Sequence, residues 1–318
     1  MKLAFSIIIP VYNRPNEIDE LLESLSQQDL SANFEVLIIE DGSSIKSDIV
    51  VEKHKNKLNL KYFFKENTGA GASRNFGMEK ASGNYFIILD SDVIVPKQYL
   101  LEVKKALETN YTDAFGGADA AHSSFTSLQK AINYSMTSIL TTGGIRGNKK
   151  SLGKFQPRSF NLGISKKAFE KTNGFSRMKN GEDIDLTFRL WEHGFETQLI
   201  EKAFVYHKRR SSIKQFFRQT FGFGTARPIL NNKYPESSKI TYWFPSFFII
   251  GLDISIILTF FGFQQFLYFY GIYFLLIFID SLFQNKNLYV AFLSMISSFT
   301  QFLGYGLGFL ESKFYPKK

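Results

Sequence analysis

The chain has 318 residues, four histidines and no cysteine, and its formal net charge is +9. This length is enough for one full domain and an appendage, and the lack of cysteine excludes a disulfide framework and a cysteine zinc site. Apolar residues are unevenly distributed: residues 243–310 are almost without charge, whereas the part before them has the mixed composition of a globular domain.

The first part of the chain alternates apolar runs with amphipathic segments. Apolar runs predict strands at residues 5–11, 34–39, 60–64 and 85–89, and apolar residues at helical spacing predict helices at 17–28, 46–57 and 71–80. Strands without alternation, separated by helices, indicate a parallel sheet covered on both faces. Ligands bind such sheets at the carboxyl ends of the strands, so we expect Asp41, Asn67 and Asp90 at one edge.

Asp90-Ser91-Asp92 directly follows the predicted strand at residues 85–89. Side chains two residues apart in an extended chain point the same way, so the two carboxylates would repel each other unless they share a cation. Carboxylate oxygens suit Mg²⁺ or Mn²⁺, which can also bind phosphate oxygens. A plain acidic turn is the structural alternative for an isolated Asp-x-Asp, and the surrounding residues must decide between the two.

A glycine-rich turn at residues 67–75 leads into the predicted helix at 71–80. It is not a dinucleotide fingerprint, because Arg74 stands where the third glycine is needed and the turn follows the third strand. A helix N-terminus can still meet phosphate, with Arg74 available for charge-assisted contacts. A simple helix cap is the alternative.

A second acidic cluster, Gly-Glu-Asp-Ile-Asp at residues 181–185, opens a segment with helical spacing that stops at Gly194, and Asn180 is its predicted N-cap. Acids in a first helical turn can simply complement the helix dipole. The functional alternative is that one of them is a general base. Residues 160–164 predict a short strand upstream, and His207 lies in a basic run downstream.

These motifs, in this order, resemble the family 2 glycosyltransferases of the GT-A fold. The resemblance extends from about residue 5 to residue 218. It is carried by Ile-Pro-Val-Tyr-Asn at 9–13, Glu-Asp-Gly-Ser at 40–43, the turn at 67–75, Asp90-Ser91-Asp92, Asn-Leu-Gly at 161–163 and Gly-Glu-Asp at 181–183. The family's processive polymerases also carry Gln-x-x-Arg-Trp. Here Gln215 and Arg218 are followed by Gln219, so the tryptophan is missing and processivity is left open.

The resemblance implies an α/β GT-A fold, Rossmann-like, with a mainly parallel sheet and helices on both faces. It implies metal-dependent, inverting sugar transfer in which Asp183 is the catalytic base, and Asp90 and Asp92 hold the sugar diphosphate and its Mn²⁺ or Mg²⁺. His207 is a candidate further metal ligand, with an ordinary surface histidine as the alternative. A UDP-sugar is the expected donor and a GDP-sugar its alternative.

The expected contacts to the nucleotide sugar are Pro10, Tyr12, Asn13, Glu40, Asp41, Asn67, Gly71, Arg74, Asp90 and Ser91. The expected contacts to the acceptor or a phosphate are Asn161, Gly163, Glu182, Arg209, Arg210, Gln215 and Arg218.

Three apolar stretches at residues 243–263, 266–283 and 288–310 each approach the length that crosses a bilayer core of about 30 Å, so we expect two or three transmembrane helices. A buried helical hairpin is the alternative. Residues 202–235 are basic and contain no acid, and their phenylalanines suit an interfacial helix. Residues 120–169 are also free of acids and contain Arg146, Lys149, Lys150, Lys154 and Arg158. Basic residues with aromatics can indicate nucleic acid, but beside apolar spans they favour a membrane.

The predicted domains are a catalytic domain at residues 1–210, a basic amphipathic interfacial connector at 211–240 and a membrane region at 241–318. We predict a multi-pass protein of the cell inner membrane or plasma membrane with a cytoplasmic catalytic domain, in agreement with the cations beside the first apolar segment. Three full spans would place Lys313, Lys317 and Lys318 outside. Either one segment is re-entrant or the tail is too weakly charged to matter.

The predicted function is transfer of one sugar to a membrane-associated, polyprenyl-linked acceptor in surface-glycan assembly. A sugar-phosphate nucleotidyltransferase is the first alternative, but the glycine-rich turn that it needs after the first strand is absent. A non-catalytic membrane-bound module that binds nucleotide sugars is the second. It would have little need for Asp183 beside an intact Asp90 and Asp92 pair.

Overall fold

The computed structural model describes residues 2–29, 34–122, 124–143 and 154–315. The chain forms two compact units, of which the first comprises Met1–His122 and Gly147–Lys208 and the second Ser123–Arg146 and Arg209–Lys318. The second unit therefore takes in a segment that lies, in sequence, within the predicted catalytic domain. Arg146, Lys149, Lys150, Lys317 and Lys318 lie outside the described residues.

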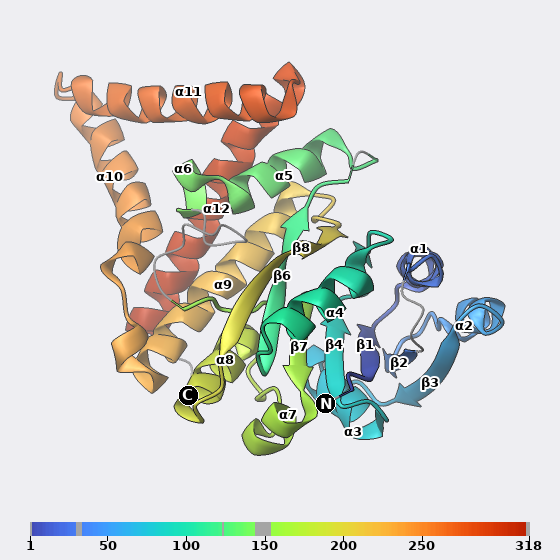
Figure 1. The fold of residues 1–318 in the computed structure, drawn as a ribbon. Coiled ribbons are helices and arrows are strands. Elements are labelled where there is room, and N and C mark those ends of the chain that lie inside the picture. Colours follow the sequence, from blue (N-terminus) through green and yellow to red (C-terminus); the bar gives the residue numbers. More distant parts are fainter. Residues whose placement is uncertain (1, 30–33, 123, 144–153, 316–318) are drawn as a thin grey trace. The chain divides into compact units, whose positions relative to one another are not determined.

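The first unit is built on an eight-stranded sheet with the order β3-β2-β1-β4-β7-β6-β8-β5 (Figure 1). The strands are β1 (Phe5–Val11), β2 (Glu35–Asp41), β3 (Asn59–Lys65), β4 (Tyr85–Leu89), β5 (Val93–Ile94), β6 (Ala114–Ala120), β7 (Asn161–Ser165) and β8 (Thr197–His207). β3, β2, β1 and β4 are parallel to one another, and β7 is antiparallel to both β4 and β6. β8 is parallel to β6, and β5 is antiparallel to β8. The carboxyl ends of β1, β2, β3, β4, β6 and β8 therefore meet at one edge.

Helices cover both faces of this sheet, as predicted. They are α1 (Pro15–Ser26), α2 (Asp48–His54), α3 (Ala70–Lys80), α4 (Tyr99–Thr109), α7 (Lys166–Thr172) and α8 (Glu182–Glu192). Successive residues of β1 belong to different hydrophobic clusters. Ile7 is buried in one cluster with Leu21 of α1, and Ile8 is buried in another with Met78 of α3. Because successive strand residues face opposite sides, both faces of the strand are packed, which explains its unbroken apolar run.

The start of α8 differs from the prediction. Its N-cap is Gly181 rather than Asn180, and Gly181 has a φ of 81°, a backbone conformation that glycine adopts without steric cost. The predicted stop is confirmed: α8 ends at Glu192, and Gly194 follows with a φ of 76°.

The second unit is helical and is organised around one long helix. Its helices are α5 (Ser127–Thr137), α6 (Ile139–Thr142), α9 (Ile213–Lys233), α10 (Phe244–Thr259), α11 (Gln265–Asn285) and α12 (Leu288–Phe314), with short 3₁₀ turns at Pro235–Ser237 and Ile240–Trp243. A Cβ at Gly304 would lie 2.2 Å from Thr220 Oγ1, and one at Gly308 would lie 2.2 Å from the carbonyl oxygen of Phe221. Glycines thus let α12 lie against α9 at a short distance.

Among the described residues of the second unit, three helical segments are long and apolar enough to cross a membrane: Ile240–Thr259, Gln265–Asn285 and Leu288–Phe314. They correspond to the three predicted apolar stretches. The predicted connector is largely α9, and its Phe216 is fully buried against Ile132 and Met136 of α5. This part of α9 therefore packs on protein.

Candidate active site

Asp41 ends β2 and holds the glycine-rich turn. Its carboxylate accepts hydrogen bonds of 2.9 Å from the N–H groups of Thr68 and Gly69, and it pairs with Lys65. Burial alone would raise the pKa of Asp41, but Lys65 and the Thr68 N–H lower it below its usual value. Asn67 adds a 2.9 Å bond to the Asp41 carbonyl. The ends of β2 and β3 are therefore joined through an ionised carboxylate.

Asn13 connects the loops that follow β1 and β2. It has a φ of 55°, its N–H donates to Ser43 Oγ at 2.8 Å, and its Oδ1 accepts from the Ile45 N–H at 2.9 Å. Left-handed backbone is uncommon outside glycine but is tolerated by asparagine. The preceding residue, Tyr12, is 53% exposed, so its ring is available at the rim.

Two residues predicted to contact the nucleotide are internal instead. Glu40 is fully buried and accepts hydrogen bonds from Ser43 Oγ and from the Ser47 N–H. Pro10 is buried within β1. Glu40 therefore supports the loop after β2 from inside.

Arg74 lies between two predicted site segments. Its Nη2 is 2.8 Å from Asp90 Oδ1, its Nη1 is 3.0 Å from Glu182 Oε1, and the residue is only 3% exposed. Burial disfavours its charge, but Asp90 and Glu182 together raise the pKa of Arg74. Burial and the neighbouring Asp183 raise the pKa of Glu182. Arg74 thus joins the end of β4 to the first turn of α8 from within the protein.

Gly71 lies in the first turn of α3, close to the same junction. A Cβ at this position would be 3.4 Å from the Cβ of Phe175 and 3.4 Å from the Ser176 carbonyl oxygen, and 3.8 Å from Cγ of Glu182. The glycine therefore allows α3 to approach the segment before α8 closely.

Asp90, Asp92 and His207 form a cluster suited to a divalent cation. Each offers one ligand atom, and these atoms lie within 4.8 Å of one another. Two carboxylate oxygens and an imidazole nitrogen are a donor set that suits Mn²⁺ and is compatible with Mg²⁺. Ser91, between the two aspartates, is only 6% exposed. The residues present therefore fit the metal that the sequence predicts.

Residues that sequence reasoning missed surround this cluster. Arg14 pairs with Asp92 Oδ2, while His207 Nε2 lies 3.4 Å from Asp92 Oδ1. On its other side, His207 Nδ1 lies 3.9 Å from Oδ2 of the buried Asp119, and the Phe160 ring stacks on the imidazole at 4.8 Å. Burial opposes ionisation of Asp92, but His207 and Arg14 lower its pKa below the usual value. A carboxylate behind a histidine can fix which ring nitrogen faces a metal.

Asp183 lies in the first turn of α8. Its Oδ1 accepts from the Ile184 N–H at 2.8 Å, its Oδ2 is 3.4 Å from the Ser159 N–H, and Arg158 Nη1 lies 3.9 Å from Oδ1. Ser159 precedes Phe160, whose carbonyl accepts a 3.3 Å bond from the Asp90 N–H. Asp183 and the metal-type cluster are therefore linked through one short segment before β7.

Asn161 and Gly163 have packing roles that differ from the predicted contact with an acceptor. Asn161 is fully buried, where its amide accepts from Tyr99 Oη at 2.6 Å and donates to the Ala203 carbonyl at 2.8 Å. A Cβ at Gly163 would lie 2.0 Å from the Phe115 ring. Neither group reaches the surface, so both hold β7 in the sheet.

The remaining predicted contacts belong to the second unit. Arg209 is only 6% exposed and donates to Asn133 Oδ1 at 2.9 Å, so its position is internal. Arg210 is half-buried, and Gln215 and Arg218 are exposed on the first half of α9. These three are the ones that remain accessible.

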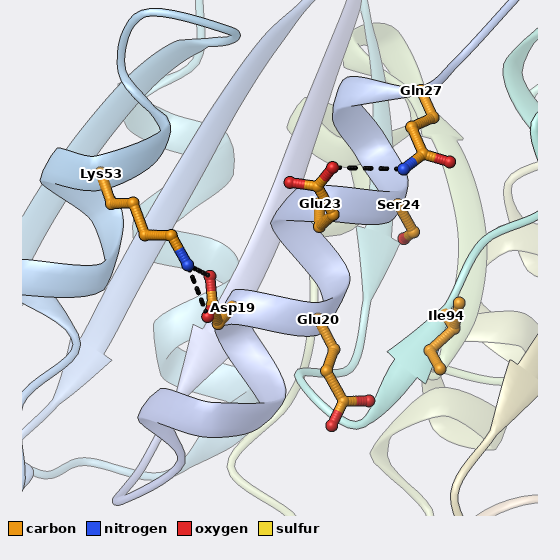
Figure 2. A pocket seen from close by; sticks show the side chains of 7 residues that line it. All are labelled: Asp19, Glu20, Glu23, Ser24, Gln27, Lys53 and Ile94. Carbon is orange, nitrogen blue, oxygen red and sulfur yellow. Dashed lines mark hydrogen bonds and ion pairs between the residues drawn. The ribbon is translucent and has the colours of Figure 1, made fainter. Parts of the chain in front are cut away.

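An open groove of about 580 Å³ lies along α1. Figure 2 shows its lining, which is Asp19, Glu20, Glu23, Ser24, Gln27, Lys53 and Ile94. Its acids have partners: Lys53 pairs with Asp19 at 2.9 Å, and Lys57 pairs with Glu23 at 2.8 Å. None of the predicted site residues lines this groove, so it is distinct from the cluster at the strand ends.

Comparison with known proteins identifies the same family that the sequence motifs resemble. The family described as "Glycosyl transferase family 2" matches residues 6–172. An uncharacterized glycosyltransferase of Haemophilus influenzae is 31% identical over 220 residues, covering 65% of this chain and 70% of that protein. The poly(ribitol-phosphate) beta-N-acetylglucosaminyltransferase TarS of Staphylococcus aureus is 36% identical over 114 residues, which cover 35% of this chain but only 20% of TarS.

Solved structures show the fold. TarS 1–349 in complex with UDP-GlcNAc has a TM-score of 0.51 at 22% identity, covering 70% of this chain and 66% of that one. The mannosyltransferase PcManGT from Pyrobaculum calidifontis, in complex with GDP-Man and Mn²⁺, has a TM-score of 0.62 at 15% identity, covering 100% and 89%. Both comparisons support the GT-A fold. With more than half of its length matched by the family, the chain belongs to glycosyl transferase family 2.

Proposed function

We propose that the first unit transfers one sugar from a nucleotide-diphosphate sugar to an acceptor hydroxyl, with inversion at the anomeric carbon. The observation that carries this proposal is the cluster of Asp90, Asp92 and His207 at the carboxyl ends of the strands, to which Asp183 is connected through Ser159 and Phe160. A UDP-sugar is the proposed donor, because TarS binds UDP and UDP-GlcNAc, and a GDP-sugar is the alternative, because PcManGT binds GDP-Man.

Asp90, Asp92 and His207 would hold Mn²⁺ or Mg²⁺. When bound, such an ion offsets the negative charge that grows on the departing diphosphate. Asp119 would keep the imidazole of His207 turned toward the ion, since it faces the opposite ring nitrogen. Tyr12, directly after β1, and Asp41, at the end of the neighbouring β2, would contact the nucleoside at the same rim.

Asp183 is proposed as the general base. Its carboxylate takes the proton of the acceptor hydroxyl while that oxygen bonds to the anomeric carbon, and the bond from this carbon to the diphosphate oxygen breaks on the opposite face. Such base catalysis typically contributes about 10² to 10⁴-fold. Arg74 would keep α8, and hence Asp183, in register with Asp90.

The proposed acceptor is a polyprenyl-linked glycan at the cell inner membrane or plasma membrane, with the first unit on the cytoplasmic side. The apolar helices of the second unit and the exposed cations of α9 support a site at a membrane surface. The name of TarS refers to poly(ribitol-phosphate). The minor teichoic acid biosynthesis protein GgaB of Bacillus subtilis is 34% identical over 94 residues, which cover 29% of this chain and 10% of GgaB.

The test uses the full-length protein in detergent or in membranes. A panel of UDP- and GDP-sugars is screened for release of nucleoside diphosphate with Mn²⁺, with Mg²⁺ and with chelator, and the anomeric configuration of the transferred sugar is read by NMR. We expect divalent-dependent release with one donor and an inverted product. A retained configuration would overturn the inverting mechanism, and release that chelator leaves unchanged would overturn the metal role.

A further inference from the structure

The third apolar helix, α12, is packed against protein more extensively than the other two. Half of its most apolar segment is buried within the structure, compared with 22% for the segment of α10 and 11% for α11. Most of its buried residues are small, and several are polar: Ser297 Oγ donates to the Ala131 carbonyl of α5 at 3.0 Å, and Ser294 Oγ lies 2.7 Å from Ser281 Oγ of α11. Such a face packs against other helices rather than lipid.

The neighbour of α12 is unsuited to hydrocarbon. Helix α9 lies against Gly304 and Gly308, and its Lys214, Arg218 and Lys233 are exposed. An exposed cation at the centre of a bilayer costs roughly 2.5 to 3.5 kcal/mol, and several would add to one another. Because α12 and α9 are packed together, α12 could not cross the hydrocarbon core without bringing these cations with it.

Helices α10 and α11 have the opposite character. Residues 254–279, between Asp253 on α10 and Asp280 on α11, contain no charged side chain. Phe260, Phe261 and Phe263, in the turn that joins the two helices, are 85%, 72% and 49% exposed. A contiguous apolar surface of this kind marks a contact with another apolar phase. In Figure 1 this turn forms an outer corner of the second unit.

The opposite end of α11 is polar, and α11 is hydrogen-bonded to α5 and α6. Asp280 accepts hydrogen bonds from Tyr134 Oη at 2.6 Å and from Ser138 Oγ at 3.2 Å. Nearer the middle of α11, Tyr273 Oη donates to the Leu140 carbonyl at 2.6 Å. Lys286 follows this end of α11 and is exposed. The α10–α11 hairpin thus has one apolar end, at the phenylalanine turn, and one polar end anchored on α5 and α6.

The start of α10 carries groups that favour a membrane interface. Tyr242 lies 4.1 Å from the guanidinium of Arg227, and the Trp243 ring stacks on Phe247. Tyrosine and tryptophan are enriched where a helix enters the head-group region, and flanking cations favour the same depth. The aromatic and cationic groups therefore lie where α10 begins, and the phenylalanine turn lies where it ends.

We propose that the α10–α11 hairpin inserts into the lipid bilayer with the turn at residues 260–264 leading, and that α12 stays on the side from which the hairpin enters. Ser238, before α10, and Tyr315, after α12, then lie on the same side of the membrane. Lys313 joins the cations of α9 there, in line with the positive-inside bias. The inference rests on the membrane attachment proposed above but not on sugar transfer.

The absence of native cysteine allows a direct test with single-cysteine variants of the full chain in its membrane. Ser238→Cys, Gln264→Cys and Tyr315→Cys are treated with a membrane-impermeant maleimide in intact cells and in inverted vesicles. Lys57→Cys, on the exposed surface after α2, marks the side of the first unit, and the cysteine-free parent gives the background.

We expect the cysteines at positions 238, 315 and 57 to react from the same side only, and the one at position 264 to be protected from that side. Labelling of position 315 from the side opposite to position 238 would show that α12 crosses and would overturn the proposal. Labelling of position 264 as readily as position 238 would show that the hairpin is not inserted. Cross-linking of two copies through position 264 would assign the apolar face to a second copy instead. No outcome depends on activity, so a failure here is separate from a failure of the proposed transfer.

Discussion

Arg74 and Glu182, 108 residues apart in sequence, form a 3.0 Å ion pair. The other terminal nitrogen of the same guanidinium binds Asp90 at 2.8 Å. Because Glu182 precedes Asp183, this one buried side chain sets the position of the proposed base relative to the end of β4. Arg74 is therefore better described as a positioning residue than as the nucleotide contact that the resemblance implies.

Arg74→Met should leave Asp90 and Glu182 without their cation. Breaking one side of a buried ion pair typically costs about 3 to 5 kcal/mol, so we expect a lower unfolding temperature together with reduced turnover. Arg74→Lys keeps the charge but cannot bridge both carboxylates, and should be intermediate. Thermal unfolding and donor hydrolysis measure the two effects. Arg14→Met removes a much more exposed arginine and is the control for stability. An equal fall in the unfolding temperature of Arg14→Met and Arg74→Met would contradict the assignment of Arg74 as the buried positioning residue.

Asp92→Asn should abolish metal-dependent donor binding while the first unit stays folded. The substitution removes one of the anions that attract the ion. Asp119→Asn, behind His207, should weaken Mn²⁺ binding by about 10 to 100-fold, as loss of an outer partner usually does. Titration of Mn²⁺ by electron paramagnetic resonance measures affinity without turnover. The assignment of Asp92 as a metal ligand would be wrong if the Asp92→Asn variant bound nucleotide equally well in Mn²⁺ and in chelator, and as tightly as the parent protein does in Mn²⁺.

Asp183→Asn should lower kcat by at least about 10²-fold with donor affinity nearly unchanged, because a base acts only in the transition state. Asp185→Asn is the matched control on the same helix. Its carboxylate is fully buried and pairs with Arg189 at 2.9 Å, so the change should reduce stability more than chemistry. If Asp185→Asn loses turnover while Asp183→Asn retains it, the base has been placed on the wrong carboxylate.

The polar residues at the strand ends could be predicted from the sequence, whereas the residues that hold them in position could not. Asp41, Asn67 and Asp90 each follow an apolar run, and parallel strands bring such positions to one edge whatever their detailed packing. Asp119 lies in β6, whose Ala-Phe-Gly-Gly-Ala-Asp-Ala sequence has too few large apolar residues to read as a strand. Its partner His207 is far away in sequence, so only the fold brings the two together.

The role of α12 was hidden by its composition. Length and hydropathy alone make it equivalent to the other two apolar helices. The distinguishing signal is its spacing of small residues, with Gly304 and Gly308 separated by one helical turn, which is typical of close helix packing. The inclusion of Ser123–Arg146 in the second unit has no comparable signal, because α5 is recognisable as part of that unit only through its contacts with α9, α11 and α12.

Acid should destabilise the first unit partly through Glu35. Its carboxylate accepts from Ser6 Oγ at 2.6 Å and pairs with Lys61 at 2.7 Å; burial alone would raise the pKa of Glu35, but these partners lower it to about 2 from 4.5. A lowered pKa means that the stabilisation is complete above the unfolded value of 4.5 and is lost as pH falls toward 2.

Glu35→Gln should therefore reduce stability at neutral pH and flatten its dependence on pH between about 4.5 and 2. Hydrogen exchange of peptides from β1 and β2 reports the first unit separately from the helical unit. Curves for the variant and the parent that stay parallel across this window would show that Glu35 is not the responsible group.

The acceptor prediction concerns the exposed cations of α9. A lipid-linked pyrophosphate brings its own negative charge to the membrane surface, where Lys214 and Arg218 are accessible while Arg209 is held by Asn133. Lys214→Glu with Arg218→Glu in the full chain should therefore reduce transfer to a membrane-embedded acceptor and leave donor hydrolysis unchanged. The difference in transfer between the variant and the parent should shrink at high salt, because exposed charges are screened.

Truncation before α10 is a poorer test, since it would remove α12 from α5 and α9 and expose the surfaces that α12 covers. Lys166→Glu with Lys171→Glu, two exposed lysines of α7, makes the same change in net charge on the first unit. If this control pair reduces membrane transfer as much as the α9 pair, general surface charge and not a site on α9 explains the effect.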